Sequence, residues 1–207
     1  MDYDTGYDVR AAYYDVEAPA VPMVPRRTFS TVFAGPRAFE LAGHAVQTYS
    51  LEVGGNTGSG AFEQVSLESL LAGPGSLAAV KADGLAALGN ATNLGLFEDR
   101  ASAAAFQAMI WEIVLDYDGT EESLDIEGTG SANFMASGID AAIFEQMKQH
   151  VLAGVDTSRC FTVYKADGLE NQILFDNPNP SVPLPGVSIL GIAGLATVGA
   201  RRRRALV

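Results

Sequence analysis

The chain has 207 residues, of which 48% are apolar and 18% charged, and its 25 acidic and 13 basic side chains give a net charge of −12. The apolar content excludes a disordered protein, which combines low hydropathy with high charge, and the acidic balance excludes a general nucleic-acid binder, because an acidic surface repels phosphate. The single cysteine, Cys160, excludes a disulfide framework or cysteine-based zinc cluster, and His44 and His150 leave little for metal or acid–base chemistry.

The first 27 residues are acidic and tyrosine-rich at their start and carry three prolines, at positions 19, 22 and 25, toward their end. Prolines spaced in this way favour extended chain over helix. The stretch does not show the basic start, apolar core and small-residue cleavage site of a signal peptide. We therefore predict that residues 1–27 form an acidic, proline-punctuated flexible leader.

Residues 28–176 mix strand and helix patterns, which predicts a single α+β domain of antiparallel strands with packed helices. Helices are predicted over 76–88, 100–115 and 139–153. Asp99 or Ser102 can cap the second of these helices, and Gly154 can end the third. Short strands are predicted at 28–33, 45–53, 62–70, 123–127, 133–135, 160–165 and 172–175.

Gln107 lies on the apolar stripe of the predicted 100–115 helix, one turn before Trp111. A buried amide must be hydrogen-bonded, because an unpaired polar group in a protein core is costly. We therefore expect the side chain of Gln107 to reach a loop or a neighbouring strand, in the role of a structural core glutamine.

Two other candidate sites favour a structural interpretation. The acidic, glycine-turned run 116–122 contains carboxylates of the kind that calcium loops use, but the full EF-hand pattern is absent. An exposed acidic loop is therefore favoured. Cys160 lies in a predicted strand, where it fits a small apolar residue better than a reactive thiol. We expect neither a metal site nor a cofactor.

The C-terminus has three parts in a fixed order. Residues 177–186 form a proline-rich linker that contains Val182-Pro183-Leu184-Pro185, an uncharged apolar run continues to residue 200, and Arg201-Arg202-Arg203-Arg204 follow. As a helix, the apolar run would cover about 22 Å, and snorkelling arginines bring it closer to the roughly 30 Å of a bilayer core. We predict that residues 187–207 form a single transmembrane helix with an Arg-rich cytoplasmic tail. A buried core helix with a basic tail is the alternative.

This three-part order resembles the PEP-CTERM sorting signal in its VPLPA-type variant, with Gly186 where that variant carries alanine. The resemblance implies recognition in the inner membrane by an exosortase, a cysteine transpeptidase-like enzyme, and transfer to the cell surface or extracellular matrix after cleavage near the proline motif. Because export requires a signal peptide, we expect one upstream of residue 1.

A second resemblance concerns the predicted domain. The helix segment Phe106-Gln107-Ala108-Met109-Ile110-Trp111-Glu112-Ile113 is similar to the helix motif of thioester-type surface domains, and Tyr49-Ser50-Leu51-Glu52 stands where their cysteine-containing strand motif belongs. In those domains the cysteine thiolate condenses with the helix glutamine. The serine hydroxyl of Ser50 is far less acidic than a thiol and needs an activating base. We therefore interpret Ser50 and Gln107 as a vestigial cross-link site, joined by a hydrogen bond.

Three functions follow for comparison. The leading hypothesis is an exported surface or extracellular-matrix protein, not an enzyme, with a structural or binding role. A second is a thioester-like covalent adhesin that has lost or altered its internal bond. A third is a serine hydrolase using Ser50 with His44 or His150, although no Gly-x-Ser-x-Gly motif surrounds Ser50.

The leading hypothesis also fixes the expected location and partners. The protein would be held in the bacterial inner membrane, with residues 28–176 outside the cytoplasm. Processing of the sorting signal would then release it to the cell surface or matrix. Its expected partners are an exosortase-like enzyme, the inner membrane, and an extracellular matrix or surface polysaccharide. Nucleic acid is not among them.

Overall fold

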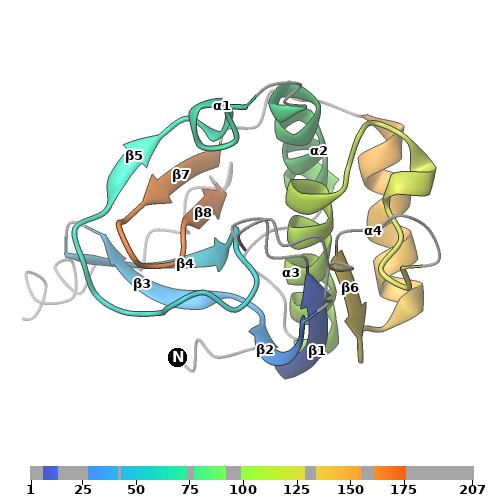
Figure 1. Ribbon diagram of the computed structural model, residues 1–207, viewed down its shortest axis with the longest axis horizontal. Helices are drawn as coiled ribbons and strands as arrows, with labels where there is room; N and C mark the ends of the chain where they lie inside the picture. Colours follow the sequence, from blue (N-terminus) through green and yellow to red (C-terminus); the bar gives the residue numbers. More distant parts are fainter. Residues whose placement is uncertain are drawn as a thin grey trace, which may run out of the picture. The chain divides into compact units, whose positions relative to one another are not determined.

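The computed structural model describes residues 7–13, 28–41, 43–73, 77–91, 99–128, 134–154 and 161–175. The chain divides into two compact units, residues 1–176 and 177–207, and every described residue belongs to the first. Its described part contains eight strands in two antiparallel sheets, together with four α-helices (Figure 1). The domain is therefore α+β, as predicted.

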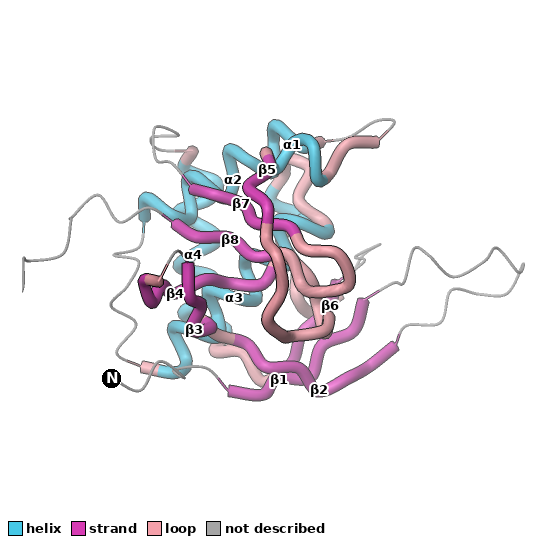
Figure 2. The backbone as a smooth tube through the Cα atoms, turned by 90° about the vertical axis from the view of Figure 1, so that its left-hand side faces the viewer, coloured by secondary structure: helices cyan, strands magenta, loops and turns pink. Residues whose placement is uncertain are grey.

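The larger sheet has five strands in the order β3-β4-β8-β7-β5, and Figure 2 shows them one below another. Strands β4, β7 and β8 confirm predictions from the sequence, whereas β3 was not predicted. Strands β3 and β4 form a hairpin in which Leu41 pairs with His44, and Gly43 takes the positive φ of 81° that this tight turn requires. The strands span β3 (Arg37–Leu41), β4 (His44–Ser50), β5 (Glu63–Val65), β7 (Phe161–Lys165) and β8 (Gln172–Phe175).

The smaller sheet has three strands, with β1 (Tyr7–Tyr13) between β2 (Thr28–Ala34) and β6 (Phe134–Ser137). Strand β1 lies within the segment 1–27 that we expected to be a flexible leader, and for residues 7–13 that expectation is wrong. The pairing partners of β1 come from two other segments of the chain, so the local composition could not reveal them. Ala11 in this strand is completely buried.

The helices largely follow their sequence signals. Asp99 caps α3, accepting a 2.8 Å hydrogen bond from the backbone N–H of Ser102, and Gly154 ends α4 with a φ of 60°. Both predicted ends are thus confirmed. The helices span α1 (Leu67–Leu70), α2 (Ala78–Ala91), α3 (Arg100–Leu115) and α4 (Ala141–Ala153).

One predicted strand is confirmed only in part, and another is wrong. In the segment 62–70, only β5 is extended, because the hydroxyl of Ser66 accepts a 3.0 Å bond from the N–H of Ser69 and starts the helical turn α1. The segment 123–127 begins at the end of a 3₁₀ turn (Glu121–Ser123). A second turn follows, in which the N–H of Gly128 donates a 3.3 Å hydrogen bond to the carbonyl of Asp125. Local side-chain and backbone hydrogen bonds override the strand pattern in both places.

Helix α3 is the central element of the domain. Every residue from Ala103 to Val114 is buried, and α3 contacts strands of both sheets as well as α2 and α4. One side of the helix contributes Phe106 and Ile110 to the core against the larger sheet, while Trp111 packs against the smaller sheet. A helix surrounded on all sides must be apolar on nearly every face, so its few polar residues stand out.

No helix in the described part of the chain is long and apolar enough to cross a membrane. The predicted linker with its sorting motif at 182–185, the predicted transmembrane segment 187–207, and Cys160 all lie outside the described residues.

Candidate functional site

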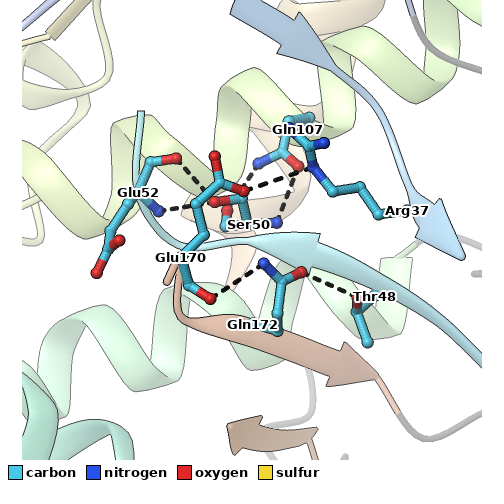
Figure 3. A network of polar contacts seen from close by, with 7 residues as sticks. All are labelled: Arg37, Thr48, Ser50, Glu52, Gln107, Glu170 and Gln172. Carbon is cyan, nitrogen blue, oxygen red and sulfur yellow. Dashed lines mark hydrogen bonds and ion pairs between the residues drawn. The ribbon is translucent and has the colours of Figure 1, made fainter. Parts of the chain in front are cut away.

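A buried polar network lies where β4 ends, beneath the loop that follows it (Figure 3). Its members come from β3, β4, the loop after β4, α3, β8 and the turn before β8. Apart from Arg37 and Glu52, these side chains are almost completely buried. The residues are Arg37, Thr48, Ser50, Glu52, Gln107, Glu170 and Gln172.

The centre of the network is a two-point contact between Gln107 and the backbone of Ser50. The carboxamide Nε2 of Gln107 donates to the Ser50 carbonyl at 2.8 Å, and its Oε1 accepts from the Ser50 N–H at 3.2 Å. The two residues are 1% and 2% exposed, so water does not compete for these groups. The prediction that Gln107 is a hydrogen-bonded core residue reaching a strand is confirmed.

This contact extends the hydrogen-bond ladder of the sheet beyond the end of β3. The N–H of Leu51 donates to Asn171 at 2.9 Å, toward β8, and successive N–H groups of a strand point to opposite sides. The backbone of Ser50 therefore faces the side on which β3 pairs, but that pairing ends at Arg37 with Thr48. The carboxamide of Gln107 takes the place of the missing peptide group.

The hydroxyl of Ser50 is engaged separately from Gln107. It donates to the carbonyl of Glu52 at 2.8 Å and accepts from the Glu52 N–H at 3.1 Å. The hydrogen bond predicted between Ser50 and Gln107 therefore exists, but the backbone of Ser50 makes it. The arrangement places a carboxamide beside a serine while the serine Oγ is held by its own chain.

The network contains two carboxyl groups, those of Glu170 and Glu52. Burial raises the pKa of Glu170, which is 3% exposed, whereas the charge of Arg37 lowers it and the charge of Glu52 raises it. Burial also raises the pKa of the half-buried Glu52. Arg37 Nε lies 3.5 Å from Glu170 Oε2, and Figure 3 shows the Glu170 carboxyl group turned toward Ser50 and Arg37.

Thr48 and Gln172 complete the network across the two central strands. The Thr48 hydroxyl donates to Gln172 Oε1 at 2.9 Å, and Gln172 Nε2 donates to the carbonyl of Glu170 at 3.3 Å. We did not predict Arg37, Thr48 or Glu170 as site residues. A polar residue at the head of the apolar run Gln172–Phe175 is the one local signal that could have suggested this contact.

The geometry bears on the hydrolase alternative. His44 starts β4 and Ser50 ends it, so six residues of extended strand, roughly 20 Å, separate them. Both His44 and His150 are exposed, His150 in the last turn of α4. Figure 3 shows the carboxyl group of Glu170, rather than an imidazole, turned toward Ser50.

Asp118 accepts from the N–H and the hydroxyl of Thr120 at 2.9 and 2.7 Å, which makes 118–122 an exposed turn held by its own side chains. Within the described ranges, no three His, Cys, Asp or Glu side chains are grouped to hold a metal ion.

No family model, curated protein or solved structure matches the chain. The two resemblances therefore rest on the residues quoted for them, and the description of the site rests on its geometry.

Proposed function

We propose that the protein is exported and anchored in the inner membrane by a PEP-CTERM-like signal, with its α+β domain outside the cytoplasm in a structural or binding role. The C-terminal order of proline motif, apolar run and arginines supports the anchoring. The charge distribution agrees with it, because removal of the four tail arginines from the 13 bases leaves nine bases against 25 acids, or −16 for the part outside. An exosortase-like enzyme would process the signal, and the acidic domain would meet a matrix or surface polysaccharide.

For the domain itself, we propose a thioester-like scaffold without the reactive bond. The observation that carries this proposal is the two-point contact of Gln107 with the Ser50 backbone. It holds the helix glutamine against the strand serine, as the resemblance implies, while the Ser50 hydroxyl is bound by Glu52. A hydroxyl is a poor nucleophile without a base, so hydrogen bonds replace the acyl link.

The anchoring is tested by neutral replacement of Arg201–Arg204 in cells that express the full chain. Membrane retention or C-terminal processing should fall, because the arginines hold the tail on the cytoplasmic side. Neutral replacement of Arg26 and Arg27 is the matched control and should change neither. Unchanged membrane fractionation and unchanged mature mass in the tail variant would refute the anchoring.

The scaffold is tested by intact mass of the purified domain. Wild type should show no loss of ammonia, because Gln107 keeps its amide. Ser50→Cys should lose one ammonia, because a thiolate is a far better nucleophile than a hydroxyl, and Ser69→Cys at an exposed position should not. An ammonia loss in wild type that Gln107→Ala abolishes would instead establish the covalent adhesin. A folded Ser50→Cys protein of unmodified mass would refute the thioester-like arrangement.

A further inference from the structure

A glycine-rich loop follows the Ser50 end of β4 and folds against the β7–β8 turn. We call residues 54–60 the glycine strap; all of them are exposed. The N–H of Glu170 donates to the carbonyl of Asn56 at 2.9 Å. A Cβ on Gly60 would lie 2.8 Å from the side chain of Leu169, closer than real side chains approach one another. The absence of a side chain at Gly60 thus lets the strap lie on the turn without displacing the Leu169 methyl group.

The tightest point of the glycine strap lies between two carboxyl side chains. A Cβ on Gly55 would lie 2.5 Å from Cγ of Glu170 and 3.2 Å from Oε2 of Glu52. Closure of the strap therefore brings its backbone against both acids at once. A movement of the Glu52 or Glu170 side chain therefore displaces the strap, because the strap backbone packs directly against both side chains.

The charges beneath the strap do not balance. The charged groups that act on Glu170 are Arg37 from β3 and Glu52 from the loop after β4. Arg37 is 29% exposed and lies beside Glu170, while Glu52 accepts a hydrogen bond from the amide of Asn171. Arg37 thus pairs with Glu170, and burial disfavours a further negative charge on the half-buried Glu52 nearby.

We propose that the glycine strap is a pH-dependent lid over the Ser50–Gln107 network. The lid is closed while at least one of Glu52 and Glu170 is protonated, and it opens when both are ionised. The carboxyl O–H bond breaks, its electron pair stays on the carboxylate oxygen, the proton passes to solvent, and no bond between heavy atoms changes. Release of the strap uncovers Glu170 and, with it, the hydroxyl of Ser50. The inference rests on the proposed function only in taking this network as the site that the lid covers.

The pKa values agree with this direction. Burial raises the pKa of both Glu52 and Glu170, so the closed form binds more protons than an open form in which both groups meet water. Closure is therefore fully favoured below the ordinary carboxyl pKa of about 4.3 and is lost as the pH rises through the raised values. Each proton released changes the closing equilibrium by up to about tenfold per pH unit.

Hydrogen exchange of the full chain between pH 5 and pH 8, corrected for intrinsic rates, tests the lid. Protection of the Glu170 amide, which donates to the carbonyl of Asn56 in the strap, should fall with rising pH in wild type. The double variant E52Q/E170Q should stay protected at both pH values, because neutral amides of the same shape cannot ionise. Glu68→Gln, on the exposed face of α1, should behave as wild type. Protection that does not change with pH in wild type, or an unaltered slope in the double variant, would overturn the proposal.

A second variant separates the lid from its titration. Gly55→Ala should lower protection of the Glu170 amide to the open level at both pH values, because the methyl group collides with the Glu170 side chain. Gly73→Ala, whose Cβ would meet nothing within 4 Å, is the matched control and should leave the strap unchanged. Wild-type protection in Gly55→Ala would also overturn the lid. Neither result depends on membrane fractionation or intact mass, so the lid and the proposed function can fail separately.

Discussion

Replacement of Gln107 measures what its contact with Ser50 contributes to the fold. Gln107→Met keeps most of the side-chain volume but leaves the N–H and C=O of Ser50 buried without those two hydrogen bonds. An unsatisfied buried polar group costs about 1–3 kcal/mol, so two of them predict a loss of roughly 2–6 kcal/mol in the free energy of unfolding. Gln107→Ala should lose more, because it adds a cavity beside α3.

Urea unfolding followed by circular dichroism provides the measurement, with the slope of the transition compared between variants. Gln146→Met on the exposed face of α4 is the control and should change stability by less than about 0.5 kcal/mol. A Gln107→Met protein within that same margin of wild type would show that the Ser50 backbone is satisfied in another way. The carboxamide of Gln107 would then not act as a replacement for the missing peptide group of the ladder.

Two further predictions concern α3 and its packing. Burial, assisted by the charge of Asp116, raises the pKa of Glu112 to about 8, so wild-type stability should fall as the pH rises from the ordinary carboxyl range through about 8. The full change is about 4–5 kcal/mol at 1.36 kcal/mol per pKa unit, and Glu112→Gln should flatten this part of the pH–stability curve; an unchanged curve would contradict the assignment. Gly84→Ala should destabilise the protein by about 1–3 kcal/mol in thermal unfolding despite its better helix propensity, because the new Cβ would lie 3.0 Å from the Tyr117 ring; a stabilised variant would show that the ring moves freely.

The elements that the sequence predicted well carry their own local signals. Helix α3 has a capping aspartate, an apolar stripe of helical period and no internal glycine or proline, and its observed bounds agree with the prediction. Helix α4 has a left-handed glycine at its end. These signals act over three or four residues, so they do not depend on contacts with distant parts of the chain and can be read from the sequence.

The elements that were missed depend on partners elsewhere in the chain. Strand β1 pairs with both β2 and β6, and strand β3 lies at the edge of the larger sheet, where one face need not be apolar. The predicted strand at 62–70 failed in part for a related reason: the Ser66 hydroxyl offered the backbone a helical turn in place of a ladder partner. Strand pairing and helix capping compete for the same backbone groups, and the local composition does not decide which of the two forms.

The sequence by itself determined the α+β class, the central helix, the polar anomaly at Gln107 and the order of motifs at the C-terminus, because each depends on residue type and short-range spacing. Only the tertiary structure decided that Gln107 binds the backbone of Ser50, that the Ser50 hydroxyl turns to Glu52, and that Glu170 stands beside them. The contact of Ser50 with Gln107 joins residues 57 positions apart and depends on where β3 stops short of its neighbour, whereas the contact of Ser50 with Glu52 is local but forms only where β4 ends. A gap in a ladder is a property of paired strands, and so it exists only once the sheet has formed.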